Sequence, residues 1–123
     1  MIIEEVLIKY LTDASIVGSS VYAMTPKQPV DGDYIVIDKT GSAYQNGISR
    51  ATVAIQSISS ESLYKASQIN EDVIGAMEYF PANVTNVFGC HLQSDYNFTN
   101  TATKQYRYQA VYEITYKRED TIS

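Results

Sequence analysis

The chain has 123 residues, 45% of them hydrophobic, and a formal net charge of −5 at pH 7. This length suits one ordinary core, and we expect residues 1–123 to form a single domain. One cysteine, Cys90, excludes an intrachain disulfide and a four-cysteine zinc site, and the acidic balance argues against a large nucleic-acid-binding face. Eleven tyrosines beside no tryptophan favour strands and association surfaces.

Residues 2–12 are predicted to form an amphipathic helix. Glu4 and Glu5 in its first turn complement the helix dipole. Its apolar stripe consists of Ile2, Ile3, Val6, Leu7, Tyr10 and Leu11. The acidic start differs from a signal peptide, and no run approaches the roughly 18 apolar residues of a membrane span. We therefore expect a soluble protein that is made in the cytosol and has no membrane partner.

The next segment is expected to contain two strands. Residues 13–20 are typical of a turn, and residues 21–23 of a short strand. Pro26 and Pro29 then argue against a central strand. Residues 33–38, DYIVID, predict a compact strand after a turn at Gly32. Residues 40–49, TGSAYQNGIS, show no period and predict either a long hairpin loop or a flexible arm.

Residues 50–58 alternate between apolar and polar side chains, which predicts a half-buried strand. Ser59 and Ser60 are expected to cap the helix that follows, with Glu61 in its first turn. That helix is predicted to be the longest, at about 20 residues, and to end at Pro81. Its apolar rhythm is carried by Leu63, Ala66, Ile69, Val73, Ile74, Ala76, Met77 and Phe80.

Two further strands complete the predicted sheet. The first covers residues 87–93, and residues 97–103 are expected to form a polar turn. The second, at 105–117, alternates strictly except for Val111 on its polar face, and its apolar face holds Tyr106, Tyr108, Ala110, Tyr112, Ile114 and Tyr116. A strand of about 12 residues exceeds most strands of small sheets, so part of it is expected to project or to meet a neighbour. Residues 118–123 are expected to be a frayed tail.

This order of elements predicts an α+β fold. We expect a mostly antiparallel, mixed sheet of about four or five strands, packed on one face by the N-terminal helix and the longer central helix.

The sequence has few residues with which to build a catalytic or metal site. His91 is the only histidine, and Cys90 beside it points to the opposite face of a strand, so the two are not expected to act together. The segment Asp31-Gly32-Asp33 resembles the start of a calcium loop but lacks the remaining ligands. No phosphate-binding glycine loop or nucleophile elbow is present. We therefore predict no catalytic residue, no metal and no cofactor.

The whole organisation resembles the tail terminator, or tail-completion, proteins of long-tailed bacteriophages and prophages. The segments that carry the resemblance are IIEEVLIKYL at the start, DYIVID, RATVAIQSIS before the central helix, and YQAVYEITYKRE near the end. It extends from residue 1 to about residue 118. Such proteins form a homohexameric ring that caps the tail tube and joins it to the head.

The resemblance implies a virion protein without enzymatic activity, located at the tail or neck. Its expected partners are other copies of itself, the tail tube protein and the head–tail connector proteins, while DNA passes through without specific binding. The segment from Thr40 to Ser49 becomes the candidate contact with the tube or a neighbouring subunit, through Thr40, Tyr44, Gln45, Asn46 and the adjoining Arg50. Tyr106, Tyr108 and Tyr112 become a candidate edge for extending the sheet between subunits.

Two other readings of the sequence stay open. Head-completion and stopper proteins of the phage neck have similar length and mixed α/β content. A small non-catalytic binding module is the second alternative, and it would have a concave apolar pocket.

Overall fold

The computed structural model describes residues 2–17, 20–23, 32–99 and 105–117. The predictions about Pro26, Pro29, most of the 97–103 turn and the 118–123 tail lie outside these residues. In chain order the elements are α1 (Ile3–Asp13), β1 (Val21–Tyr22), β2 (Tyr34–Gln45), β3 (Ile48–Ser59), α2 (Leu63–Glu78), α3 (Phe80–Asn83), β4 (Val87–Asn97) and β5 (Tyr106–Lys117).

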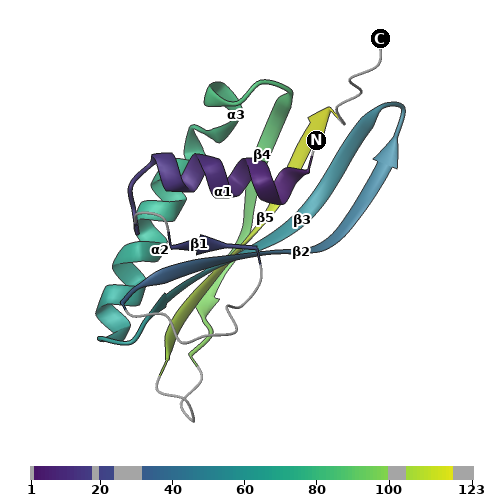
Figure 1. Cartoon of the computed structure of the whole chain (residues 1–123). Coiled ribbons are helices and arrows are strands. Elements are labelled where there is room, and N and C mark those ends of the chain that lie inside the picture. The colour runs from purple at the N-terminus through teal and green to yellow at the C-terminus, as the bar shows by residue number, and fades with distance from the viewer. Residues whose placement is uncertain (1, 18–19, 24–31, 100–104, 118–123) are drawn as a thin grey trace.

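The strands form one five-stranded sheet in the order β1-β2-β3-β5-β4. β1 runs parallel to β2, and the other neighbours are antiparallel. The expected α+β fold with a mixed sheet is confirmed. Helices α1 and α2 lie on the same face of this sheet, while the β2–β3 hairpin extends past them (Figure 1).

The main core lies between that face and the helices. The predicted stripe of α1 supplies three of its fully covered side chains, Ile3, Leu7 and Leu11. The alternation predicted for the third and last strands also holds, because Ala51, Val53, Ile55, Ala110, Tyr112 and Ile114 are all buried beneath the helices. Full burial of a Val, Leu or Ile side chain contributes about 1.5–3 kcal/mol.

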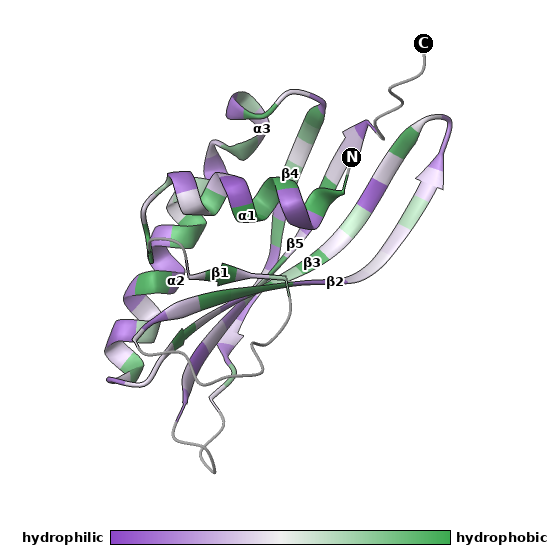
Figure 2. Ribbon diagram, in the orientation of Figure 1, coloured by the Kyte–Doolittle hydropathy of each residue, from purple (hydrophilic) through white to green (hydrophobic). Residues whose placement is uncertain are grey.

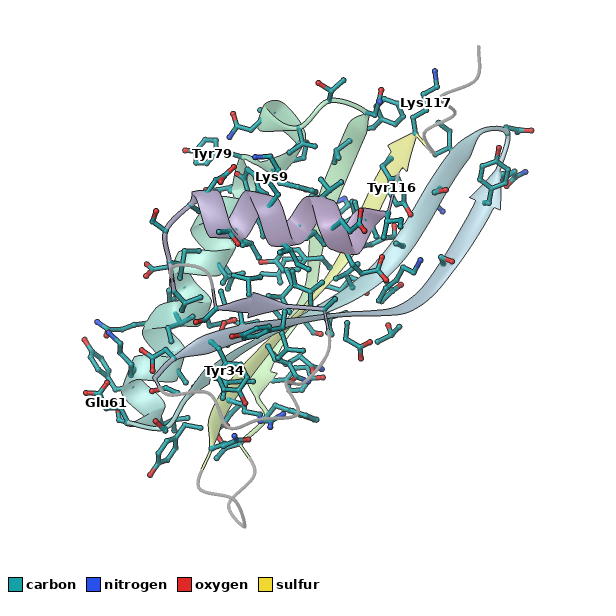
Figure 3. All side chains as sticks on the ribbon, in the orientation of Figure 1. Lys9, Tyr34, Glu61, Tyr79, Tyr116 and Lys117 are labelled. Carbon is teal, nitrogen blue, oxygen red and sulfur yellow. The ribbon has the colours of Figure 1, made fainter. Side chains whose placement is uncertain are left out.

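A second, smaller cluster lies on the other side of the sheet. Tyr34, Val36 and Ile58 are buried there, and Tyr22 packs against them. Figure 3 shows Tyr34 on the side of β2 that faces away from α1. Both sides of the β1 end of the sheet are therefore apolar, which explains the continuous hydrophobic run in DYIVID.

The boundaries of the central helix differ from the prediction. Ser62 caps α2, and its hydroxyl accepts a 3.0 Å hydrogen bond from the Lys65 amide. Ser59 instead accepts a bond from the Glu61 amide, so Ser59, Ser60 and Glu61 precede the helix. At the other end, α2 finishes at Glu78, and Pro81 lies in the first turn of α3. Proline is well tolerated at that position because the first amides of a helix have no helical partner.

Candidate functional site

The clearest projecting feature is the far half of the β2–β3 hairpin, residues 38–50, which we call the arm. All β2 residues from Asp38 to Gln45 are exposed, whereas the four before them are buried. Figure 2 shows the same change, from hydrophobic colours under the helices to pale and hydrophilic colours in the projecting part. The arm thus lies beyond the region where the helices cover the sheet.

The prediction of a long loop or flexible arm at 40–49 is wrong. β2 pairs with β3 as far as Gln45 opposite Ile48, so only Asn46 and Gly47 lie outside the strands. Their φ angles of 54° and 81° are those of a tight hairpin turn, for which Asn-Gly is a favoured pair. The register shifts once, between Lys39 and Gly41. The arm is a paired ribbon with one bulge.

The tip of the arm brings together four of the five predicted contact residues. Tyr44, Gln45, Asn46 and Arg50 line a shallow hollow of about 390 Å³, together with Ala43 and Ile48. Thr40 lies away from this hollow, and its hydroxyl donates to the Thr52 carbonyl at 3.4 Å. At the base of the tip, Arg50 Nε lies 3.6 Å from Glu113 Oε1.

The prediction that the last strand, β5, offers an open edge to a neighbouring subunit is wrong. β5 pairs with β3 on one side and with β4 on the other over most of its length, so it is an interior strand. Tyr112 is only 2% exposed and belongs to the core, and Tyr106 and Tyr108 are half-buried. Long alternating strands are equally typical of edges and interiors, and alternation alone does not distinguish them.

The edge strand of the sheet next to β5 is β4. Among the described strands, it pairs only with β5. Four large apolar side chains on and just after this strand are exposed: Phe88, Leu92, Tyr96 and Phe98. They lie on both faces of the sheet, because Leu92 is paired with the core residue Tyr112 and Tyr96 is paired with Gln109 on the helix-free face. The alternation that would predict this edge strand is weak in the sequence, because the register shifts at Phe88 and Gln93 interrupt it.

A chain of side-chain hydrogen bonds crosses the helix-free face of the sheet from β2 to β4. Gln105 donates to the Tyr34 hydroxyl at 3.2 Å, and Arg107 donates to Gln105 and to Gln56. Gln56 then donates to Gln109 at 2.9 Å, and Gln109 donates to the Tyr96 hydroxyl. Such a network links four strands into one unit and favours a rigid sheet.

Cys90 and His91 lie on opposite faces of β4, as expected of strand neighbours. Cys90 packs against the core, and burial raises the pKa of its thiol to about 11. His91 is exposed. Within the described residues, no group of three or more His, Cys, Asp or Glu side chains is placed to hold a metal ion.

A polar hydroxyl also lies close to Cys90. The Tyr112 oxygen is buried and has no hydrogen-bond partner among the described residues. Its pKa is raised, chiefly by burial and further by the negative charges that Cys90, Asp95 and Glu71 can carry. The hydroxyl therefore stays protonated at neutral pH. Asn70 on α2 closes this side of the core by donating a 2.6 Å hydrogen bond to Asp95 on β4.

A second, larger hollow of about 790 Å³ lies between the segment after α1 and the first half of α2. Its lining is mostly polar and includes Lys65 and Asp33, whose charged atoms are 4.0 Å apart. This is unlike the apolar pocket expected of a binding module. None of the helices in the described part of the chain has the length and apolar character needed to cross a membrane.

Comparison with known proteins adds one likeness of fold. No protein-family model matches the chain, and no curated protein matches it. Among solved structures, the chain is similar to one from the virion of a native gene transfer agent (GTA) particle, with a TM-score of 0.75 at 16% sequence identity. The match covers 94% of this chain and 94% of that chain, so the shared fold extends over nearly the full length of both.

Proposed function

We propose that this chain is a structural subunit of a phage-like virion, and that its copies form a hexameric ring that caps the tail tube and joins the tail to the head. The observation that carries the proposal is the likeness of fold to a chain of a gene transfer agent virion, over 94% of each chain. The order of elements, which resembles that of tail terminators, supports the finer assignment.

The work of such a subunit is contact with other proteins, and the arm is suited to it. Its residues project beyond the helices, and the paired strands hold them in place. We assign Tyr44, Gln45, Asn46 and Arg50, which surround the tip hollow, to contact with the tail tube. Thr40, nearer the base of the arm, is assigned to contact with a neighbouring subunit.

The proposal is tested by adding the purified chain to tails isolated from particles that lack it. A tail terminator is expected to bind one end of each tail and to restore joining to filled heads, both visible by negative-stain microscopy. Binding to isolated portal or adaptor rings, with no binding to tails, would instead identify a head-completion or stopper protein. Binding to neither would contradict a role in the virion neck.

A further inference from the structure

The sheet has two open edges on opposite sides of the subunit. One is β4, and the other is the outer side of β2 in the arm, because β1 pairs only with Ile35 and Val36 among the described residues. We infer that copies of this chain join edge to edge, with β4 of one copy pairing with residues 38–45 of the next. This inference rests on the proposed function, since it names the contacts that close the ring.

The β4 edge has the composition of an interface. Soluble proteins usually guard an open edge with lysine, proline or β-bulges. The strand from Val87 to Asn97 contains no lysine or proline, and its two register shifts leave the runs 89–92 and 94–97 regular. Its one acidic residue, Asp95, is bonded to Asn70 on α2. Phe88 is 58% exposed, Leu92 42% and Tyr96 41%. Exposed apolar side chains thus lie on both faces beside the open edge, and a neighbouring subunit that pairs with β4 would cover them.

The side chains on the β2 edge are small, which complements the large side chains on β4. Between Lys39 and Tyr44 it presents only small side chains, those of Thr40, Gly41, Ser42 and Ala43. A strand of small residues can approach a neighbouring backbone closely and leave room for the bulky side chains of β4. Eight residues of β2 and eight of the eleven residues of β4 are exposed, so the two edges have similar lengths.

The strand directions are compatible with this pairing in a ring. β2 and β5 run one way, and β3 and β4 run the other way. In a cyclic ring whose axis lies roughly along the strands, every copy has the same orientation. β4 of one copy then meets β2 of the next in antiparallel orientation. The two surfaces are different, so the contact is heterologous, and it gives a ring when the rotation between neighbouring copies closes.

The test is disulfide cross-linking between single-cysteine variants in a Cys90→Ser background. One set carries a cysteine on the arm, at Thr40, Ser42 or Ala43, and the other carries one on β4, at Leu92, Gln93 or Ser94. Side chains opposite each other in paired strands are close enough for a disulfide. Gln68→Cys, on the exposed side of α2, is the matched control.

Each arm variant is mixed with each β4 variant and oxidised, both free in solution and bound to tails. We expect covalent dimers in at least one mixture, and loss of those dimers when either partner is replaced by Gln68→Cys. Dimers formed by a β4 variant alone would overturn the inference in favour of a symmetric contact. Absence of dimers from every mixture would also overturn it.

Wild-type chain on the same tails separates this inference from the proposed function. If tails are capped but no arm–β4 dimer forms, the ring is built from other surfaces and only the edge pairing fails. If dimers form but tails are not capped, the edge pairing holds and the proposed function fails.

Discussion

The hydroxyl of Tyr10 on α1 donates a 2.6 Å hydrogen bond to the carbonyl oxygen of Ala76 near the end of α2. The ring of Tyr10 also meets Phe80 edge to face, with centroids 4.9 Å apart. The first helix is thus joined to the end of the second by one polar and one aromatic contact. The Ala76 carbonyl also accepts a 3.2 Å hydrogen bond from the Tyr79 amide, so the Tyr10 hydroxyl is its second donor.

Replacing Tyr10 by Phe tests the polar contact by itself. The ring stays in place while the hydrogen bond is lost, and we expect the free energy of unfolding to fall by about 1 kcal/mol. The measurement is urea denaturation followed by circular dichroism. Tyr79→Phe, at a side chain that is 62% exposed, is the control and should change stability little. Equal effects of the two substitutions would contradict the role given to Tyr10.

The aromatic contact is tested by Phe80→Ala. Phe80 is fully buried, so its removal leaves a cavity and should cost about 3–5 kcal/mol. Tyr79→Ala, one residue earlier and exposed, should stay within about 0.5 kcal/mol of the wild type. Thermal unfolding compares the two variants directly. A loss of less than about 1 kcal/mol at Phe80 would mean that α3 does not close the core as described.

The turn at the tip of the arm depends on Gly47. Its φ of 81° is strained for any residue with a side chain, so Gly47→Ala should destabilise the protein by about 1–2 kcal/mol. Gly41→Ala in the same hairpin is the matched control, because its φ is not left-handed and nothing lies within 4 Å of the added methyl group. Chemical denaturation measures both. A destabilisation of equal size at Gly41 would argue against the tight turn.

The thiol of Cys90 is expected to react slowly with iodoacetamide. Because burial raises its pKa from 9.0 to about 11, far less thiolate is present at pH 9 in the folded chain than in the unfolded chain. Mass spectrometry of the time course should show the rate rising steeply when guanidinium unfolds the protein. Equal rates in both states would contradict the burial of this thiol.

The same shift links stability to pH. The folded chain holds the Cys90 proton more tightly than the unfolded chain, so this group contributes stability below pH 9 that is lost as the pH rises toward 11. The raised pKa of Tyr112 acts in the same direction at still higher pH. Cys90→Ser should therefore lose less stability than the wild type between pH 9 and 11. An identical decline in both proteins would remove Cys90 as a cause.

The arm itself can be shortened without disturbing its turn. Removing residues 43–45 and 48–50 leaves Asn46-Gly47 between Ser42 and Ala51, which already face each other in the register. We expect the core to fold with reduced stability, because Ser49 is buried and pairs with Tyr116 of β5, and we expect tail capping to be lost. Circular dichroism and the tail-binding assay measure the two effects. Full capping by the shortened chain would sink the assignment of the tip to the tube.

The sequence predicted the parts of the fold that bury one face. β5 was found because Ala110, Tyr112 and Ile114 alternate toward the helices, and α1 because Leu7 and Leu11 fall on one stripe. In both cases the core imposes a period that the sequence must follow.

Elements that bury neither face show no hydrophobic periodicity in the sequence. The second half of β2 was missed because Gly41, Ser42 and Ala43 are exposed on both faces, so no hydrophobic pattern distinguishes strand from loop. Its one local sign was Asn46-Gly47, the hairpin turn. The order of the strands in the sheet is also not predictable from the alternation, because β5 would show the same alternation at an edge as in the interior. Val111, the one apolar residue on its polar face, is half-buried opposite Ala54 of β3, as an interior strand allows.

The mass of the assembly in solution provides a direct test of the hexameric ring. Light scattering across a wide concentration range, with negative-stain images of the same fractions, should give six times the 13.7 kDa of one chain and a particle with a central hole, in solution or when tail tubes are added. A strict dimer at every concentration, with or without tubes, would contradict the ring. So would a chain that stays monomeric and leaves the tubes uncapped.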